Sequence, residues 1–167
     1  MRTAPLVLLL FPSVLACASA PPVGSGATPE DTAKVAAETP AQKCLAIAGA
    51  AREQKAGEPA KVGVRHVLVR YRGAKNAPDA IARTREEACL RALEARDKIL
   101  AQTIDFDQAV KDYSDEAGAA DRRGAMGTLE RREMTPPFAD AAMELSIGQM
   151  SDVVETDFGF HLILRSE

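Results

Sequence analysis

The sequence predicts an α+β domain over residues 62–167. Strand-like apolar runs stand near both ends of this region, and each run contains one of the only two histidines, His66 and His161. Helical patterns lie between the runs, so the expected order is strand, helices, strand, helix, strand, strand. An imidazole in an apolar strand needs partners for both ring nitrogens, and two neighbouring strands can supply them to each other.

The first expected strand covers residues 64–71. Side chains alternate across a strand, so His66 and Leu68 should share one face while Val67 and Val69 point to the other. The glycine and proline residues that follow predict a loop.

Two helices are expected after this loop. Thr84 and Glu87 have the spacing of a capping box, which predicts a helix that runs to about Gln102. A second, shorter helix is expected over residues 106–113. Residues 114–125 are rich in Gly and Ala and predict a loop.

The C-terminal part predicts a short strand at 126–129 and then a helix capped by Thr135. Pro136 stands at the first position of that helix, where a missing N–H does no harm. Residues 153–156 and 159–165 predict a terminal hairpin.

The N-terminal residues 1–17 resemble an export signal. Arg2 supplies a positive start, and the apolar run 6–15 is shorter than the ~20 residues that span a bilayer. Cys17 ends a sequence that resembles a bacterial lipobox, which predicts lipidation of Cys17. Residues 18–20 (Ala-Ser-Ala) resemble an ordinary cleavage site that would remove this cysteine. Either route predicts an extracytoplasmic protein, on the periplasmic side of a bacterial membrane if it is a lipoprotein.

Residues 18–61 predict a flexible spacer, because they are rich in Pro, Gly, Ala and Thr and their first 43 residues, 18–60, contain no aromatic residue. A short helix is expected within it near 41–55. The three cysteines then leave Cys44 and Cys89 as a pair if Cys17 is lipidated or removed. In an oxidising compartment this pair predicts either a disulfide or two small buried hydrophobic residues.

Composition and motifs exclude several functions. The net charge of −3 gives no electrostatic case for binding nucleic acid. Two histidines and scattered carboxylates do not have metal-ligand spacing, and no phosphate loop or nucleophile motif is present. We therefore expect no metal and no cofactor. An enzyme without covalent chemistry, or a binding module, suits this pattern.

Six blocks of the sequence, in order, resemble the parvulin-type peptidyl-prolyl cis-trans isomerases. The blocks are 65–69 (RHVLV), 113–115 (YSD), 123–127 (RGAMG), 134–138 (MTPPF), 145–151 (LSIGQMS) and 156–164 (TDFGFHLIL). The resemblance covers residues 62–167. It implies a four-stranded antiparallel sheet flanked by about four helices, in the order βαααβαββ, and an activity on X-Pro bonds of proline-containing polypeptides.

The resemblance also implies roles for individual residues. His66 and His161 resemble the paired histidines at the floor of the parvulin site, and Thr156 resembles the hydroxyl residue that hydrogen-bonds to them. Glu116 stands where the family places a cysteine or an acidic residue facing the substrate. The loop here is one residue longer than in some relatives, so Asp115 is the alternative. Taken singly, each histidine could also be a satisfied core residue without a role in turnover.

The proline ring is expected to lie against Met126, Met134 and Phe138, which resemble the apolar pocket of the family. Thr135 stands where a Gln or Asn often binds the substrate backbone. Phe158 departs from the family, which more often has a small residue in the terminal turn.

Three basic residues, Arg70, Arg72 and Lys75, cluster on the first strand and its loop. In phosphate-selective parvulins a basic loop here binds the phosphorylated residue before proline. A solvated basic edge and a preference for Asp or Glu before proline are the alternatives. The expected function is to assist folding of exported proteins. The alternative is a non-catalytic, chaperone-like module that binds Pro peptides at the membrane.

Overall fold

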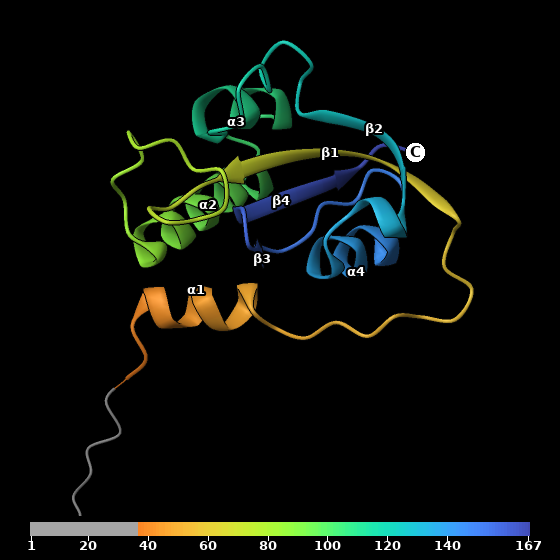
Figure 1. Cartoon of the computed structure of the whole chain (residues 1–167), viewed down its shortest axis with the longest axis horizontal. Helices are drawn as coiled ribbons and strands as arrows, with labels where there is room; N and C mark the ends of the chain where they lie inside the picture. Colours follow the sequence, from red (N-terminus) through yellow and green to blue (C-terminus); the bar gives the residue numbers. More distant parts are fainter. Residues whose placement is uncertain (1–36) are drawn as a thin grey trace, which may run out of the picture. The chain divides into compact units, whose positions relative to one another are not determined.

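The computed structural model describes residues 37–167, which lie in one compact unit, Ala36–Glu167 (Figure 1). Cys17, the export signal and the first part of the expected spacer lie outside the described residues. The elements are α1 (Pro40–Ala48), β1 (Lys61–Val69), α2 (Arg85–Leu100), α3 (Phe106–Tyr113), β2 (Ala125–Glu130), the 3₁₀ helix η1 (Arg131–Glu133), α4 (Pro136–Glu144), β3 (Val154–Thr156) and β4 (Gly159–Arg165).

The strands form one antiparallel sheet in the order β2-β1-β4-β3, which confirms the expected four-stranded sheet. The first and last strands of the domain, β1 and β4, are neighbours at its centre. In their register His66 pairs with Ile163, and Leu68 pairs with His161. Directly opposed residues share a face, so the two histidines are diagonal neighbours on the same face.

Each face of the sheet is covered by helices, as the alternation along β1 predicts. Val67, Val69 and Leu162 belong to the core beneath α1, α2 and α3. Val64 and Ile163 belong to a second core beneath α4. The two cores thus assign α4 to one face of the sheet and α2 and α3 to the other; Figure 1 shows α3 above β1 and α4 below β4.

The helix between Thr84 and residue 100 has the predicted capping box. The Thr84 hydroxyl accepts from the Glu87 amide at 3.2 Å, and the Glu87 carboxylate accepts from the Thr84 amide at 2.7 Å. Only α2 and α3 lie between β1 and β2, whereas the family order βαααβαββ has three helices there. Residues 114–124 form turns instead, and the fourth α-helix, α1, precedes β1.

The helix expected near 41–55 begins at Pro40 and ends at Ala48, because Gly49 follows as its C-terminal cap. A disulfide joins Cys44 of α1 to Cys89 of α2, with the Cα atoms 6.0 Å apart. Of the two alternatives expected for this cysteine pair, the structure contains the disulfide. The disulfide fastens part of the expected spacer to the domain. The compact unit therefore includes α1, upstream of the boundary expected at residue 62.

The chain between α1 and β1 passes along α4 (Figure 1). Arg52 pairs with Glu144 at the end of α4, at 3.2 Å, and Glu58 pairs with Arg131 of η1 at 2.5 Å. These pairs hold the connection at both ends of α4, the helix that carries Phe138. None of the helices within residues 37–167 has the length and apolar character needed to cross a membrane.

Candidate active site

The two histidines lie side by side on the face of the sheet that α4 covers. Their rings are stacked at an interplanar angle of 20° with centroids 5.5 Å apart. The two Nδ1 atoms are 3.3 Å apart, and both side chains are buried. The neighbouring strands thus supply the partner that each imidazole needs.

Glycine at position 124 makes room for His66. The Gly124 carbonyl accepts from the His66 amide at 2.9 Å, and Gly124 has φ +75°. A Cβ at this position would lie 2.5 Å from the His66 carbonyl oxygen and 2.8 Å from Val110. Only glycine therefore allows the turn before β2 to approach the histidine strand this closely.

A continuous line of hydrogen-bond partners runs through the pair. Glu116 Oε2 lies 2.9 Å from His66 Nε2, and Thr156 Oγ1 lies 2.8 Å from His161 Nε2. The Phe158 amide donates to Thr156 Oγ1 at 3.1 Å. This places Thr156 against the pair, as the resemblance implies.

The direction of each hydrogen bond in this series follows from the Glu116 carboxylate at one end of it. An ionised Glu116 carboxylate only accepts, so His66 Nε2 carries a proton and donates to it. In a neutral His66, Nδ1 is then an acceptor, so His161 Nδ1 donates to it. His161 Nε2 is left to accept from the Thr156 hydroxyl, whose oxygen accepts from Phe158. Every donor has one acceptor in this arrangement.

Electrostatics favour these protonation states. The hydrogen bond from His66, together with the charge of Arg122, lowers the pKa of Glu116, although partial burial opposes the shift. Complete burial, with smaller effects of His66 and Arg70, holds the pKa of His161 well below its usual range. Glu116 is therefore ionised and His161 neutral at neutral pH.

An apolar wall stands over the histidine floor. Phe138 meets both imidazoles edge-on, with centroid distances of 5.9 Å to His66 and 5.2 Å to His161. Met126, Met134 and Phe138 line a hollow of about 300 Å³ together with both histidines. The remaining lining residues are Leu68, Arg70, Asn76, Glu116, Glu133, Thr135 and Phe158.

The structure places Glu116 and Asp115 in different positions. Glu116 lines the hollow and also pairs with Arg122. Asp115 accepts from the Arg70 amide at 2.8 Å and pairs with Arg83, so its carboxylate supports the end of β1. Of the two carboxylates, Glu116 is the one in position to meet a ligand.

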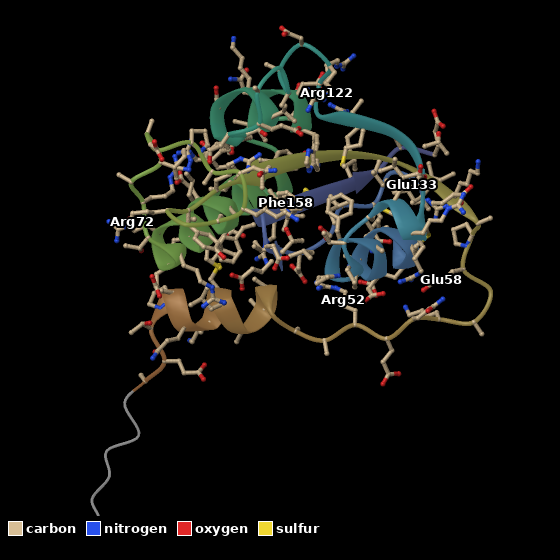
Figure 2. The ribbon with its side chains drawn as sticks, in the orientation of Figure 1. Arg52, Glu58, Arg72, Arg122, Glu133 and Phe158 are labelled. Carbon is tan, nitrogen blue, oxygen red and sulfur yellow. A yellow bond between two sulfur atoms is a disulfide. The ribbon has the colours of Figure 1, made fainter. Side chains whose placement is uncertain are left out.

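The three basic residues Arg70, Arg72 and Lys75 also lie in different positions. Arg70 lines the hollow, whereas Arg72 and Lys75 do not. Figure 2 shows Arg72 at the periphery, well away from Phe158. The Lys75 ammonium lies 5.1 Å from the centre of the Phe158 ring, and the Lys75 carbonyl accepts from Arg70 at 2.8 Å.

Four residues of the hollow were not among the residues expected to bind substrate: Leu68, Asn76, Glu133 and Phe158. Leu68 could have been found, because it alternates with His66 and Arg70 on one face of β1. Phe158 was visible only as a departure from the family. Asn76 and Glu133 come from a loop and from η1, whose position relative to the hollow depends on tertiary packing.

The hollow offers an apolar surface and the Glu116 carboxylate, and its lining within residues 37–167 contains no activated nucleophile. Both ring nitrogens of each histidine are held by hydrogen bonds, so neither ring is free to activate a nucleophile. Among residues 37–167 no cluster of His, Cys, Asp or Glu could hold a metal ion. The fold and this site together define a parvulin-type peptidyl-prolyl cis-trans isomerase.

Comparison with known proteins agrees with this class. Residues 66–167 match the Rotamase family, described as the PPIC-type PPIASE domain, and the chain belongs to this family. It is 38% identical over 111 residues to the dodo protein of Drosophila melanogaster, a match that covers 64% of this chain and 66% of dodo. It is 35% identical over 114 residues to peptidyl-prolyl cis-trans isomerase Pin1 of Malus domestica, covering 64% and 93%.

Among solved structures, the chain is similar to the peptidyl-prolyl isomerase ESS1 from Candida albicans, with a TM-score of 0.61 and 29% identity. That similarity covers 65% of this chain and 63% of ESS1. The chain thus spans slightly less than two thirds of dodo and ESS1 and nearly all of the Malus protein.

Proposed function

We propose that this prolyl isomerase acts on X-Pro bonds of exported proteins during their folding, at a membrane to which a lipid on Cys17 anchors it. The observation that carries the catalytic part is the hollow itself, where an apolar wall meets an ionised carboxylate above a fixed histidine floor.

The reaction requires little chemistry. Rotation about a peptide bond has a barrier of about 18–20 kcal/mol because the C–N bond has partial double-bond character. X-Pro bonds exchange over tens to hundreds of seconds without a catalyst. A 10⁴-fold acceleration needs about 5–6 kcal/mol of stabilisation of the transition state.

Differential binding supplies this stabilisation. A twisted amide has lost conjugation, so its carbonyl is less polar than that of a planar amide. A wall made of Met126, Met134 and Phe138 favours the less polar state while it holds the proline ring. We expect Thr135, which lines the hollow at the start of α4, to bind the substrate backbone next to the ring. In this role the histidines orient Glu116 and exclude water rather than transfer protons.

Arg70 is the basic residue best placed to contact the residue before proline. It lines the hollow, and its Nη1 donates to the Lys75 carbonyl at 2.8 Å. A guanidinium suits a carboxylate or phosphate. We expect Arg72 and Lys75 to contribute less, because they lie outside the hollow.

Isomerisation of short peptides tests the catalytic proposal. Wild-type protein should accelerate cis-trans exchange of Leu-Pro peptides, and Phe138→Leu should lower kcat/KM by at least tenfold while Ile147→Leu, at an exposed turn, leaves it unchanged. Binding of the peptides without acceleration would instead support the chaperone-like module.

The role of Arg70 is tested with Glu-Pro, phosphoSer-Pro and Leu-Pro peptides. Wild type should act faster on the acidic peptides, and Arg70→Gln should remove this difference, whereas Arg72→Gln should keep it. Equal rates of wild type on all three peptides would show that Arg70 does not contact the residue before proline.

The Cys44–Cys89 disulfide supports the extracytoplasmic location, since such bridges persist in oxidising compartments. Metabolic labelling with palmitate and the mass of the mature protein test the anchor. Labelling that is lost in Cys17→Ser supports lipidation. A mature protein that begins after Ala20 and carries no label would establish the other cleavage route.

A further inference from the structure

A second hollow, of about 540 Å³, lies on the other side of Thr135 from the histidine site. It is lined by the end of α1 with residues 49–52, by the start of α4, by the end of β3 with the turn that follows, and by Tyr71. We call it the Thr135 groove, because Thr135 is the one residue that lines both hollows. Its volume is within the range of about 300–1,000 Å³ that is usual for ligand sites.

The groove is bordered by backbone that an extended chain can use. β3 is an edge strand, paired only with β4 in the sheet order β2-β1-β4-β3. An edge strand presents unpaired N–H and C=O groups, to which an extended peptide can add. On the facing wall, the amides of Ala51 and Arg52 have no hydrogen-bond acceptor among the described residues.

The charges around the groove are mostly paired. Arg52 is paired with Glu144, Asp140 with Arg131, and Glu155 with Arg85.

Asp157 is the exception, because it is exposed and has no ion-pair partner within residues 37–167. Beside it, burial and the Glu155 carboxylate raise the pKa of Tyr71, which keeps the phenol neutral. The unbalanced charge of the groove is therefore negative and complements a lysine or arginine.

One wall of the groove lies outside residues 66–167, which match the family. This wall consists of Ala48, the last residue of α1, and residues 49–52, and the disulfide fastens α1 to α2. Arg52 then ties this segment to Glu144 of α4; Figure 2 shows Arg52 beside α4. One wall of the groove is thus supplied by an N-terminal segment outside the matched domain.

We propose that the Thr135 groove binds a flank of the same polypeptide whose X-Pro bond lies over the histidines, with a preference for a basic residue a few positions from the proline. The proposal rests on the proposed function, because the groove continues the site across Thr135. It assigns to Asp157 the contact with the basic side chain.

Cis-trans exchange measured by NMR tests the proposal. The peptides are a short Leu-Pro core and the same core extended by about four residues, either before or after it. Each extension has either Lys or Glu at its centre. One of the two flanks should give a kcat/KM about three- to fivefold higher for Lys than for Glu, the size expected of one exposed charge pair. The difference should shrink in 0.5 M salt.

Variants test whether the preference for Lys comes from Asp157 in the groove. Asp157→Asn should remove the preference for Lys and leave the rate on the core peptide unchanged, whereas Asp112→Asn, an equal change of charge on α3, should keep the preference. Ala51→Trp should fill the groove and remove the gain from the extension. Equal rates for Lys and Glu on both flanks, or an unchanged preference in Asp157→Asn, would overturn the groove. Failure to isomerise even the core peptide would instead refute the proposed function, and the groove with it.

Discussion

The Nδ1 atoms of His66 and His161 face each other at 3.3 Å, so one proton lies between them. The Glu116 carboxylate decides which ring holds it. Because His66 donates its Nε2 proton to Glu116, its Nδ1 accepts, and His161 donates. The carboxylate therefore sets the direction of the hydrogen bonds from His66 through His161 to Thr156.

His66→Ala should lower stability as well as activity. It removes a buried ring that satisfies both His161 and Glu116, and an unsatisfied buried polar group costs about 1–3 kcal/mol. We expect the free energy of unfolding, measured by urea denaturation, to fall by about this amount or more. Unchanged stability together with lost turnover would contradict the scaffold role of the pair.

Glu116→Gln should mainly lower catalytic activity, whereas Asp115→Asn should mainly lower the stability of the fold. Glu116 lines the hollow, so we expect Glu116→Gln to reduce kcat/KM by about tenfold or more (about 1.4 kcal/mol) with a small change in unfolding free energy. Asp115 holds the Arg70 amide and Arg83, so Asp115→Asn should reduce stability by about 1–2 kcal/mol. The opposite pattern in paired kinetic and denaturation measurements would assign the catalytic role to Asp115.

Acid should destabilise the protein through His161 before it affects the carboxylates. The folded state holds the pKa of His161 well below the value of about 6.5 expected in the unfolded chain. Below pH 6.5 the unfolded state therefore binds a proton that the folded state does not. The free energy of unfolding should fall by up to about 1.4 kcal/mol per pH unit as the pH decreases.

Urea denaturation from pH 6.5 to 5 measures this slope. The lowered pKa of Glu116 adds a loss only at lower pH, as the carboxylate becomes protonated in the unfolded state near pH 4. His161→Gln should flatten the slope between pH 6.5 and 5, whatever its effect on absolute stability. An equal slope in the variant would rule out His161 as its source.

Reduction of the Cys44–Cys89 bridge should destabilise the domain without stopping isomerisation of short peptides. The bridge closes a sequence separation of 45 residues, and such cross-links contribute about 2–4 kcal/mol. Dithiothreitol should lower the unfolding midpoint of wild type and leave that of Cys44→Ala/Cys89→Ala unchanged. Loss of short-peptide turnover on reduction would show that α1 supports the histidine site directly.

Local patterns predicted most elements closely. The Thr84–Glu87 capping box placed the start of α2, and Pro136 placed the start of α4, because these signals act within one turn of helix. Alternation along β1 assigned His66 and Val67 to opposite faces. The length of the expected helix near 41–55 was wrong, because its end depends on Gly49 and on packing against α2.

The candidate site was predicted in part. Residues that the family resemblance marked, such as Phe138 and Glu116, line one hollow with the histidines. The choice between Glu116 and Asp115 could not be made from sequence, since adjacent side chains in a loop point in directions set by their partners. For the same reason, the sequence could not show that Arg70 lines the hollow whereas Arg72 and Lys75 do not.

By itself, the sequence determined the order of the elements, the faces of β1 and the family resemblance, because these depend on local spacing and on motifs. Tertiary structure alone decided which groups meet. It brought His66 within reach of His161, 95 positions away, through the pairing of β1 with β4. It also joined α1 to α2 and left a groove beside Thr135, since contacts between distant segments depend on how whole layers pack.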